Sequence, residues 1–350
     1  MRPASGGSVV ERLDELARQL MGARNILLTT HQSPDGDGIG CLFALRRTLL
    51  RTGRRVTALT VGEIPNRYQF LPDASGTPDW ELLSERAQRE LLAGHDLVFV
   101  VDTNSWAMLG TLGDALPTTG LPAVFLDHHP NPAAPRDNLY GDPTCSSAGE
   151  VCWHLIAQLG APIDPDTATC LYTAIAYDTN SFKYIRRRAE TLHIAAALVD
   201  LGADTDEIYR NIFASNPLAK VLIMGELAQR IHLEEGGMVA WGLLDIEMIQ
   251  RTRARPDDLR DAITHLLEIE GVEIAITFKE RGENRYKVSL RSKGRFPVGG
   301  ISQRLGGGGH LYAAGAYVDG PRDEIIERVL LMASAVIAET ATRTREANGA

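Results

Sequence analysis

The segment after the first apolar run of the chain carries residue types that bind metal ions. His31, Asp35 and Asp37 stand within HQSPDGDGIG, directly after the apolar run NILLTT at 25–30. Two carboxylates two residues apart, with a histidine four residues before the first, can converge on a hard cation. Glycines at 36, 38 and 40 let the backbone approach closely. Taken by itself, the segment could also be a polar turn in which Asp37 only caps the next helix.

Acidic residues and histidines recur after three later apolar runs. Asp102 follows DLVFVV, the triplet Asp127-His128-His129 follows AVFL, and Asp178 follows the helical run CLYTAIAY. A single acidic residue at such a place is usually a helix cap or a solvated loop residue. Three predicted strands of one sheet, 25–30, 96–101 and 123–126, are each followed by Asp or by Asp with His. This repetition favours one shared site.

The combined set of donors defines the chemistry of that site. Four aspartates and two histidines form a hard, mixed oxygen and nitrogen set, and the absence of thiolates from it argues against structural zinc. Carboxylates suit Mg²⁺ or Mn²⁺, and the imidazoles favour Mn²⁺. Six ligands are too many for one ion that keeps a water molecule, so we expect two Mn²⁺ ions per chain, with Mg²⁺ as the alternative. Such a pair acts on phosphoesters.

An α/β fold must position these residues. Short apolar runs at 25–30, 55–61, 96–101 and 123–126 alternate with amphipathic stretches such as 38–51, a pattern that predicts a mostly parallel sheet flanked by helices. In such sheets ligands bind outside the carboxyl ends of the strands. Ser147 and Glu150 are spaced as a capping box that begins a helix over 150–159. Further helices are predicted over 166–177, 189–201, 205–213 and 218–230.

The pattern changes after residue 235. A strand at 238–245, a helix at 256–268, a hairpin of 272–279 with 285–291, a glycine-rich segment at 306–309 and a helix at 322–340 predict a smaller α/β domain. We therefore expect a catalytic metal-binding domain over 1–215, a linker over 216–235 and a substrate-binding domain over 236–350. Between Arg281 and Arg304 seven basic residues accompany one acidic residue. Four consecutive glycines and His310 follow, and their backbone N–H groups could hold phosphate. The alternative is that the basic residues form a solvated hairpin and the glycines a flexible loop.

Composition limits the possible functions. The 350 residues carry 36 Lys+Arg and 45 Asp+Glu, a formal net charge of −9, which argues against a protein that wraps long duplex nucleic acid. A small anionic substrate in one pocket stays compatible with that charge. We expect no membrane span and no secretory signal. The four cysteines show no CxxC pairing, so we expect reduced thiols and a cytoplasmic location.

The motifs together resemble the DHH phosphoesterase superfamily. The set H-x-x-x-D-x-D, D, D-H-H and D-T-x-S-F matches its catalytic domain, and SLRS at 289–292 with GGGGHLYAAG at 306–315 resembles the DHHA1 domain. The resemblance implies one ion held by His31, Asp35, Asp102 and Asp178 and another held by Asp37, Asp102, His128 and Asp178. It implies that His129 lies near the scissile phosphate and that Asp127 orients a histidine. It also implies that the far end of the substrate is held by Arg291, Ser292, Gly307, Gly308, Gly309 and His310.

The branch that the sequence resembles degrades nanoRNA and dephosphorylates pAp. It implies an enzyme for very short single-stranded RNA or DNA, down to dinucleotides, with a homodimer possible. The alternatives are a phosphodiesterase for cyclic di-AMP or pApA, and, more distantly, a non-catalytic nucleotide-binding regulator. The sequence departs from the family at Asn180, where relatives often carry glycine, which puts the turn after Asp178 in question.

Overall fold

The computed structural model contains two compact units, Met1–Ser215 and Asn216–Ala350. It describes residues 9–129, 138–186, 188–259 and 261–348, without the side chains of residues 9–11, 257, 310 and 343–348. Both units combine helices with a sheet, so the predicted α/β fold class is confirmed.

The first unit is built on a parallel five-stranded sheet. Its order is β2 (Arg55–Leu59), β1 (Asn25–Thr29), β3 (Leu97–Val101), β4 (Ala123–Asp127) and β5 (Leu139–Gly141). Every neighbouring pair is parallel, so the carboxyl ends of all five strands share one edge. The sequence predicted the first four strands. β5 has three residues, too short to give a hydrophobic pattern.

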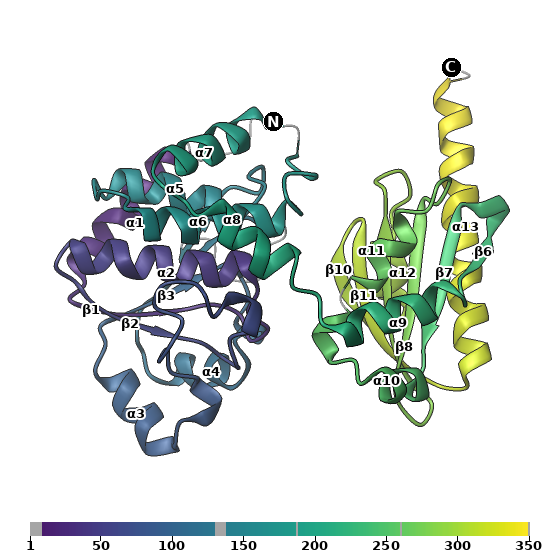
Figure 1. Cartoon of the computed structure of the whole chain (residues 1–350), viewed down its shortest axis with the longest axis horizontal. Coiled ribbons are helices and arrows are strands. Elements are labelled where there is room, and N and C mark those ends of the chain that lie inside the picture. The colour runs from purple at the N-terminus through teal and green to yellow at the C-terminus, as the bar shows by residue number, and fades with distance from the viewer. Residues whose placement is uncertain (1–8, 130–137, 187, 260, 349–350) are drawn as a thin grey trace. The chain divides into compact units, whose positions relative to one another are not determined.

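Helices cover both faces of this sheet (Figure 1). On one face lie α1 (Val9–Gly22), α2 (Gly36–Arg51), α5 (Ala148–Gln158) and α6 (Pro165–Asp178), and on the other lie α3 (Glu85–Ala93) and α4 (Gly110–Ala115). Ile26 and Leu28 of β1 pack toward the first group, whereas Leu27 packs toward the second. This alternation explains why the strand is apolar throughout. α7 (Ala189–Asp200) and α8 (Thr205–Ile208), which continues into a π-helical turn at Tyr209–Phe213, complete the unit.

A close approach of α2 to α6 brings the start of α2 to the sheet edge. A Cβ atom on Gly40 would lie 2.4 Å from the carbonyl oxygen of Cys170, so only glycine fits there. α2 begins at Gly36, two residues before the predicted start, because Asp35 is its N-cap and accepts hydrogen bonds from the N–H groups of Asp37 and Gly38.

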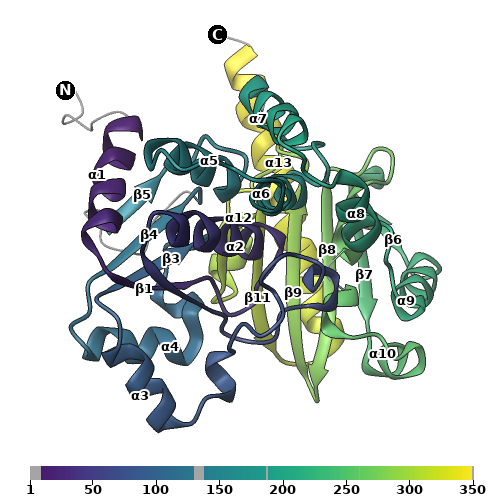
Figure 2. The same cartoon turned by 60° about the vertical axis from the view of Figure 1, so that its left-hand side comes forward.

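The second unit has a mixed six-stranded sheet (Figure 2). Only β7 and β8 are parallel, and the other neighbours are antiparallel. The long helix α13 (Arg322–Asn348) packs on one face through Ile325, Val329 and Ala333, and α11 (Ala262–Leu267) packs on the other. The strand order is β10 (Gly308–His310), β11 (Ala313–Asp319), β9 (Arg285–Ser292), β8 (Ile274–Gly282), β7 (Val239–Leu244) and β6 (His232–Glu234).

The remaining elements are short. α9 (Leu218–Ala228) and α10 (Ile246–Thr252) pack together through Ile223, Leu227 and Met248. α9 lies within the segment predicted as a linker, and its apolar residues pack within the second unit. The division into two domains and a linker stays a prediction. α12 (Gly299–Arg304) precedes the glycine-rich segment. Short 3₁₀ turns that lie wholly within the described residues include Asn66–Tyr68, Trp80–Leu82, Trp106–Leu109, Leu116–Thr118, Glu235–Gly237 and Pro256–Leu259.

One local prediction for the second unit is wrong. The single helix over 256–268 is instead the 3₁₀ turn Pro256–Leu259 followed by α11. The glycine-rich segment includes part of the edge strand β10, which pairs with β11. In the part of the chain that the structure describes, no helix is both long and apolar enough to cross a membrane.

Candidate metal centre

The eight predicted residues of the first unit all come together at the carboxyl edge of the sheet. His31 and Asp35 lie in the segment between β1 and α2, Asp37 lies in the first turn of α2, and Asp102 follows β3. Asp127 ends β4, His128 and His129 follow it, and Asp178 is the last residue of α6. Their donor atoms form three groups with separations within 4.8 Å. Those groups are His31–Asp35–Asp102, Asp37–His128–Asp178 and Asp102–Asp127–His128–His129.

Asp102 connects the two histidines of the predicted ligand sets. Its Oδ2 lies 3.5 Å from His31 Nε2, and its Oδ1 lies 4.0 Å from His128 Nε2. His31 Nε2 also lies 3.7 Å from Asp35 Oδ1. The two oxygens of one carboxylate thus face two different groups of donors, an arrangement that suits a carboxylate bridging two ions.

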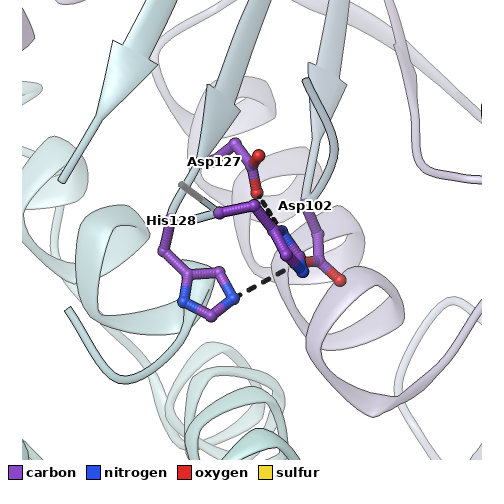
Figure 3. A group of neighbouring side chains, drawn as sticks. Asp102, Asp127 and His128 are labelled. Atoms are coloured by element: carbon purple, nitrogen blue, oxygen red, sulfur yellow. Dashed lines mark hydrogen bonds and ion pairs between the residues drawn. The ribbon is translucent and has the colours of Figure 1, made fainter. Parts of the chain in front are cut away.

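His128 gives the clearest sign that these residues fit a cation. Its Nδ1 lies 3.3 Å from the carbonyl oxygen of Cys145, which can only accept, so Nδ1 carries the proton and Nε2 carries a lone pair. That buried Nε2 has no hydrogen-bond partner among the described residues. It lies 3.4 Å from Asp178 Oδ2 and 3.7 Å from Asp37 Oδ2. Figure 3 shows its ring directed toward Asp102. An acceptor surrounded by carboxylates is unfavourable without a cation, so these residues fit a metal ion.

Asp37 is held by the start of another helix. Its carboxylate accepts hydrogen bonds from the N–H groups of Ala148 at 2.7 Å and Gly149 at 2.9 Å, the first turn of α5. Helix N-termini favour anions. Burial nevertheless raises the pKa of Asp37 well above its usual range, and the charges of Asp102 and Asp178 raise it further. The neighbouring thiol of Cys41 lies 3.5 Å from the same carboxylate.

The other inner carboxylates are perturbed in the same direction. Burial raises the pKa of Asp102 well above its usual range, with Asp35 as the next cause. The pKa of Asp178 rises to about 7, chiefly through withdrawal from water and then through Asp35, although 34% of its side-chain surface stays exposed. Without a cation, the site therefore retains protons that bound ions would displace.

Asp127 and His129 form a separate hydrogen-bonded pair. His129 Nδ1 donates to Asp127 Oδ1 at 2.7 Å, and Asn104 Nδ2 donates to Asp127 Oδ2 at 2.7 Å. Burial works against the charged forms, but this contact outweighs it, so the pKa of Asp127 is lowered and that of His129 is raised. With both oxygens engaged, Asp127 suits an orienting role better than a ligand role. Sequence reasoning missed Asn104, whose only signal was its place two residues after Asp102.

The turn after Asp178 accommodates asparagine. Asn180 has φ +48°, and Ser181 and Phe182 follow with φ +56° and +64°. Asparagine adopts the left-handed region more readily than most residues, which explains how it replaces glycine there. Thr179 Oγ1 accepts from the Phe182 N–H at 3.0 Å and supports the turn.

The predicted phosphate-binding residues of the second unit lie close in register. Arg291 is exposed on β9 and pairs with Ala313 of β11, which pairs on its other side with His310 of β10. Ser292 Oγ accepts from the N–H groups of Gly294 and Phe296, so it stabilises the turn after β9. The side chain of His310 lies outside the described part of the chain.

The glycines before His310 have a packing reason of their own. A Cβ atom on Gly307 would lie 2.3 Å from the carbonyl oxygen of Gly315, and Gly309 has φ +129°. The Gly307 N–H donates to the Ser302 carbonyl at 2.9 Å. Phosphate binding by Gly307, Gly308 and Gly309 stays a prediction.

Known proteins share this arrangement of domains. Residues 25–175 match the DHH family, N-terminal domain, and residues 244–339 match the DHHA1 domain. The chain is 29% identical over 307 residues to the bifunctional oligoribonuclease and PAP phosphatase NrnA of Thermus thermophilus, covering 87% of this chain and 88% of that protein. It is 25% identical to the cyclic-di-AMP phosphodiesterase PdeA of Listeria monocytogenes over 87% of this chain but only 46% of that protein.

A solved structure extends the likeness to the fold. An exopolyphosphatase-related protein from Bacteroides fragilis superimposes with a TM-score of 0.84 at 24% identity, covering 95% of this chain and 97% of that one. The likeness in both domains agrees with the motifs at the sheet edge. The chain therefore belongs to the DHH family of phosphoesterases, with a DHH N-terminal domain followed by a DHHA1 domain.

Proposed function

We propose that this enzyme is a two-metal phosphodiesterase that degrades very short oligonucleotides to mononucleotides and also dephosphorylates pAp. The observation that carries the proposal is the Asp102 carboxylate, whose two oxygens face His31 on one side and His128 on the other. The likeness to the Thermus oligoribonuclease and PAP phosphatase over both domains supports the choice of substrate.

The donor groups fit two ions. In the proposal, His31, Asp35, Asp102 and Asp178 hold one ion, and Asp37, Asp102, His128 and Asp178 hold the other. The grouping of His31 with Asp35 and of Asp37 with His128 supports this division. When bound, two Mn²⁺ or Mg²⁺ ions would activate water and neutralise charge on the phosphate.

The residues around the ions supply binding and proton chemistry. His129 donates Nδ1–H to Asp127, and its raised pKa favours the charged imidazolium. A charged donor of this kind stabilises negative charge that builds on a phosphate oxygen. In the second unit, Arg291 and the Gly307–His310 segment are proposed to hold the far end of a short substrate. That end is a phosphate in a 5′-phosphorylated dinucleotide and in pAp.

A cyclic-di-AMP or pApA phosphodiesterase is the second candidate. The likeness to the Listeria cyclic-di-AMP phosphodiesterase over 87% of this chain favours it. The same residues would serve either class of substrate, because cyclic di-AMP, pApA and a 5′-phosphorylated oligonucleotide each carry a phosphodiester and a second phosphate group. Only relative rates separate the two candidates.

The test compares the substrates side by side. The purified full chain is incubated with Mn²⁺ and, in separate reactions, with labelled RNA of two to five nucleotides, pAp, pApA and cyclic di-AMP. The proposal expects mononucleotides from the dinucleotide at the highest kcat/KM. A folded protein that releases no mononucleotide from any RNA would refute it, and a faster reaction with cyclic di-AMP would establish the alternative.

Two variants locate the activity. Asp102→Ala removes the shared carboxylate, and we expect at least about a 1,000-fold loss, as for removal of a central electrostatic group. Asp114→Ala changes an exposed aspartate of α4 and serves as the matched control, with unchanged activity. Equal activity of the two variants would contradict the assignment of the site.

A further inference from the structure

The segment between β5 and α5 touches two members of one donor group. The carbonyl oxygen of Cys145 accepts from His128 Nδ1 at 3.3 Å. The N–H groups of Ala148 and Gly149, three and four residues later, hold Asp37 at 2.7 and 2.9 Å. The position of this segment therefore controls Asp37 and His128 in particular.

The segment is fixed from behind by a buried polar cluster. Glu150 is fully buried and accepts from Thr191 Oγ1 at 2.6 Å, and Ser146 Oγ lies 3.1 Å from the same hydroxyl. Thr191 belongs to the first turn of α7, so its hydroxyl joins α7 to both ends of the Ser146–Glu150 corner. The predicted capping box is half present: Ser147 Oγ accepts from the Glu150 N–H at 3.2 Å, while the Glu150 side chain turns to Thr191.

Arg188 completes the cluster on its outer side. Its Nη1 donates to Thr144 Oγ1 at 2.7 Å, and its Nε lies 3.7 Å from Glu150 Oε2. Thr144 in turn donates to Asp142 Oδ1 at 2.7 Å. Both Arg188 Nε and Glu150 Oε2 are buried without a hydrogen bond among the described residues. Glu150 Oε2 therefore has Arg188 as an ion-pair partner but accepts no hydrogen bond among the described residues, an arrangement that packing alone explains poorly.

We propose that Thr191, Glu150 and Arg188 are positioning residues for the metal site that contains Asp37 and His128. The inference rests on the proposed binding of two ions. The cluster touches no proposed ligand directly. It acts through the Cys145 carbonyl and the first turn of α5. The His31–Asp35 group is positioned by the segment after β1. Outer partners of metal ligands typically change metal affinity about 10-fold to 100-fold.

Metal binding tests the proposal separately from activity. Mn²⁺ is titrated into the metal-free full chain, and binding is followed by calorimetry and by electron paramagnetic resonance, which detects the coupling of two neighbouring Mn²⁺ ions. Thr191→Val removes the hydroxyl and keeps the shape. We expect one of the two ions to bind about 10-fold to 100-fold more weakly. The other ion keeps its affinity, and the spin-coupled signal is lost at low Mn²⁺. Thr191→Ser restores the hydroxyl and both affinities.

A matched control separates positioning from loss of stability. Thr169 is also a buried threonine whose hydroxyl joins two elements, donating to the Pro165 carbonyl at 2.8 Å and accepting from the Asp204 N–H at 3.1 Å. Thr169→Val should lower the melting temperature to a similar extent without changing either Mn²⁺ affinity. Thr144 is exposed, so Thr144→Val folds in any case, and it should weaken the same ion to a smaller extent.

The outcomes distinguish two failures. A wild-type chain that binds fewer than two Mn²⁺ ions overturns the proposed function and this inference together. A wild-type chain that binds two, with unchanged affinities in Thr191→Val and Thr144→Val, overturns the inference alone. Equal weakening of both ions by Thr191→Val, reproduced by Thr169→Val, also overturns it, because it would show a general effect of stability.

Discussion

The metal-free enzyme should lose stability as the pH rises above neutrality. Several carboxylates share the sheet edge, and the pairs Asp35–Asp102 and Asp37–Asp178 each have oxygens within 4.8 Å. At that separation and an effective dielectric constant of about 20, two full charges repel by about 3.5 kcal/mol. Repulsion of this size favours retention of a proton at the site, in the same direction as the raised pKa values of Asp37 and Asp102.

The sign follows from proton binding. Asp37, Asp102 and Asp178 have raised pKa values in the folded chain, with Asp178 at about 7. The folded state therefore binds more protons than the unfolded state, and the stability from these groups falls as the pH rises from about 4 through the folded pKa. His128, with its pKa lowered to about 4, contributes the opposite trend between about pH 4 and 6.5. The interval from pH 6.5 to 8.5 avoids that opposing trend.

Thermal unfolding of the chelated protein measures the effect. Asp178, with a folded pKa of about 7, gives a loss of at most about 0.8 kcal/mol over this interval, and its partial exposure to water lowers that figure, while Asp37 and Asp102 act in the same direction. For a unit of this size a loss of about 1 kcal/mol corresponds to a decrease of about 2–4 °C in melting temperature. Asp178→Asn should flatten the dependence, and saturating Mn²⁺ should reverse it. A melting temperature of the metal-free protein that stays constant or rises from pH 6.5 to 8.5 would refute the reasoning.

Three further changes test other parts of the structure. Asn104→Ala frees one oxygen of Asp127 and should lower kcat about 10-fold to 100-fold with little change in melting temperature; steady-state rates that match the wild type would contradict the role of Asn104. Gly40→Ala should destabilise the first unit by about 1–3 kcal/mol in urea unfolding, because its Cβ would lie 2.4 Å from the Cys170 carbonyl, whereas Gly22→Ala, with nothing within 4 Å, should be nearly neutral. Asn180→Val should cost about 1–2 kcal/mol in the same assay because φ is +48°, and Asn180→Gly should retain full stability; equal stability of the two variants would argue against the left-handed turn.

Most of the first unit could be predicted because its signals are local. Apolar runs such as 97–101 and 123–127 mark buried parallel strands, and His31, Asp102 and His128 each lie within two residues of the end of such a strand. Parallel topology then brings together residues as distant as Asp37 and His128. The residue types and their repetition were enough to predict the site, because residues that follow parallel strands meet at one sheet edge whatever their side-chain geometry.

The parts that escaped prediction depend on tertiary contacts. The role of Asn104 is visible only when Asp127 lies beside it, and the Thr191–Glu150 contact joins two helices 41 residues apart. Gly308–His310 became a strand because β11 offers a partner, although glycine is poor in strands. The break of the helix predicted over 256–268 has no clear signal beyond Pro256, which opens the 3₁₀ turn.

The number of bound Mn²⁺ ions tests the central claim most directly. Equilibrium dialysis of the metal-free chain against Mn²⁺, with metal and protein measured independently, gives that number. The shared Asp102 carboxylate predicts two ions per chain in the wild type and in Asp114→Ala, and one or none in Asp102→Ala. One ion in the wild type, or two ions in Asp102→Ala, would contradict a binuclear centre bridged by Asp102.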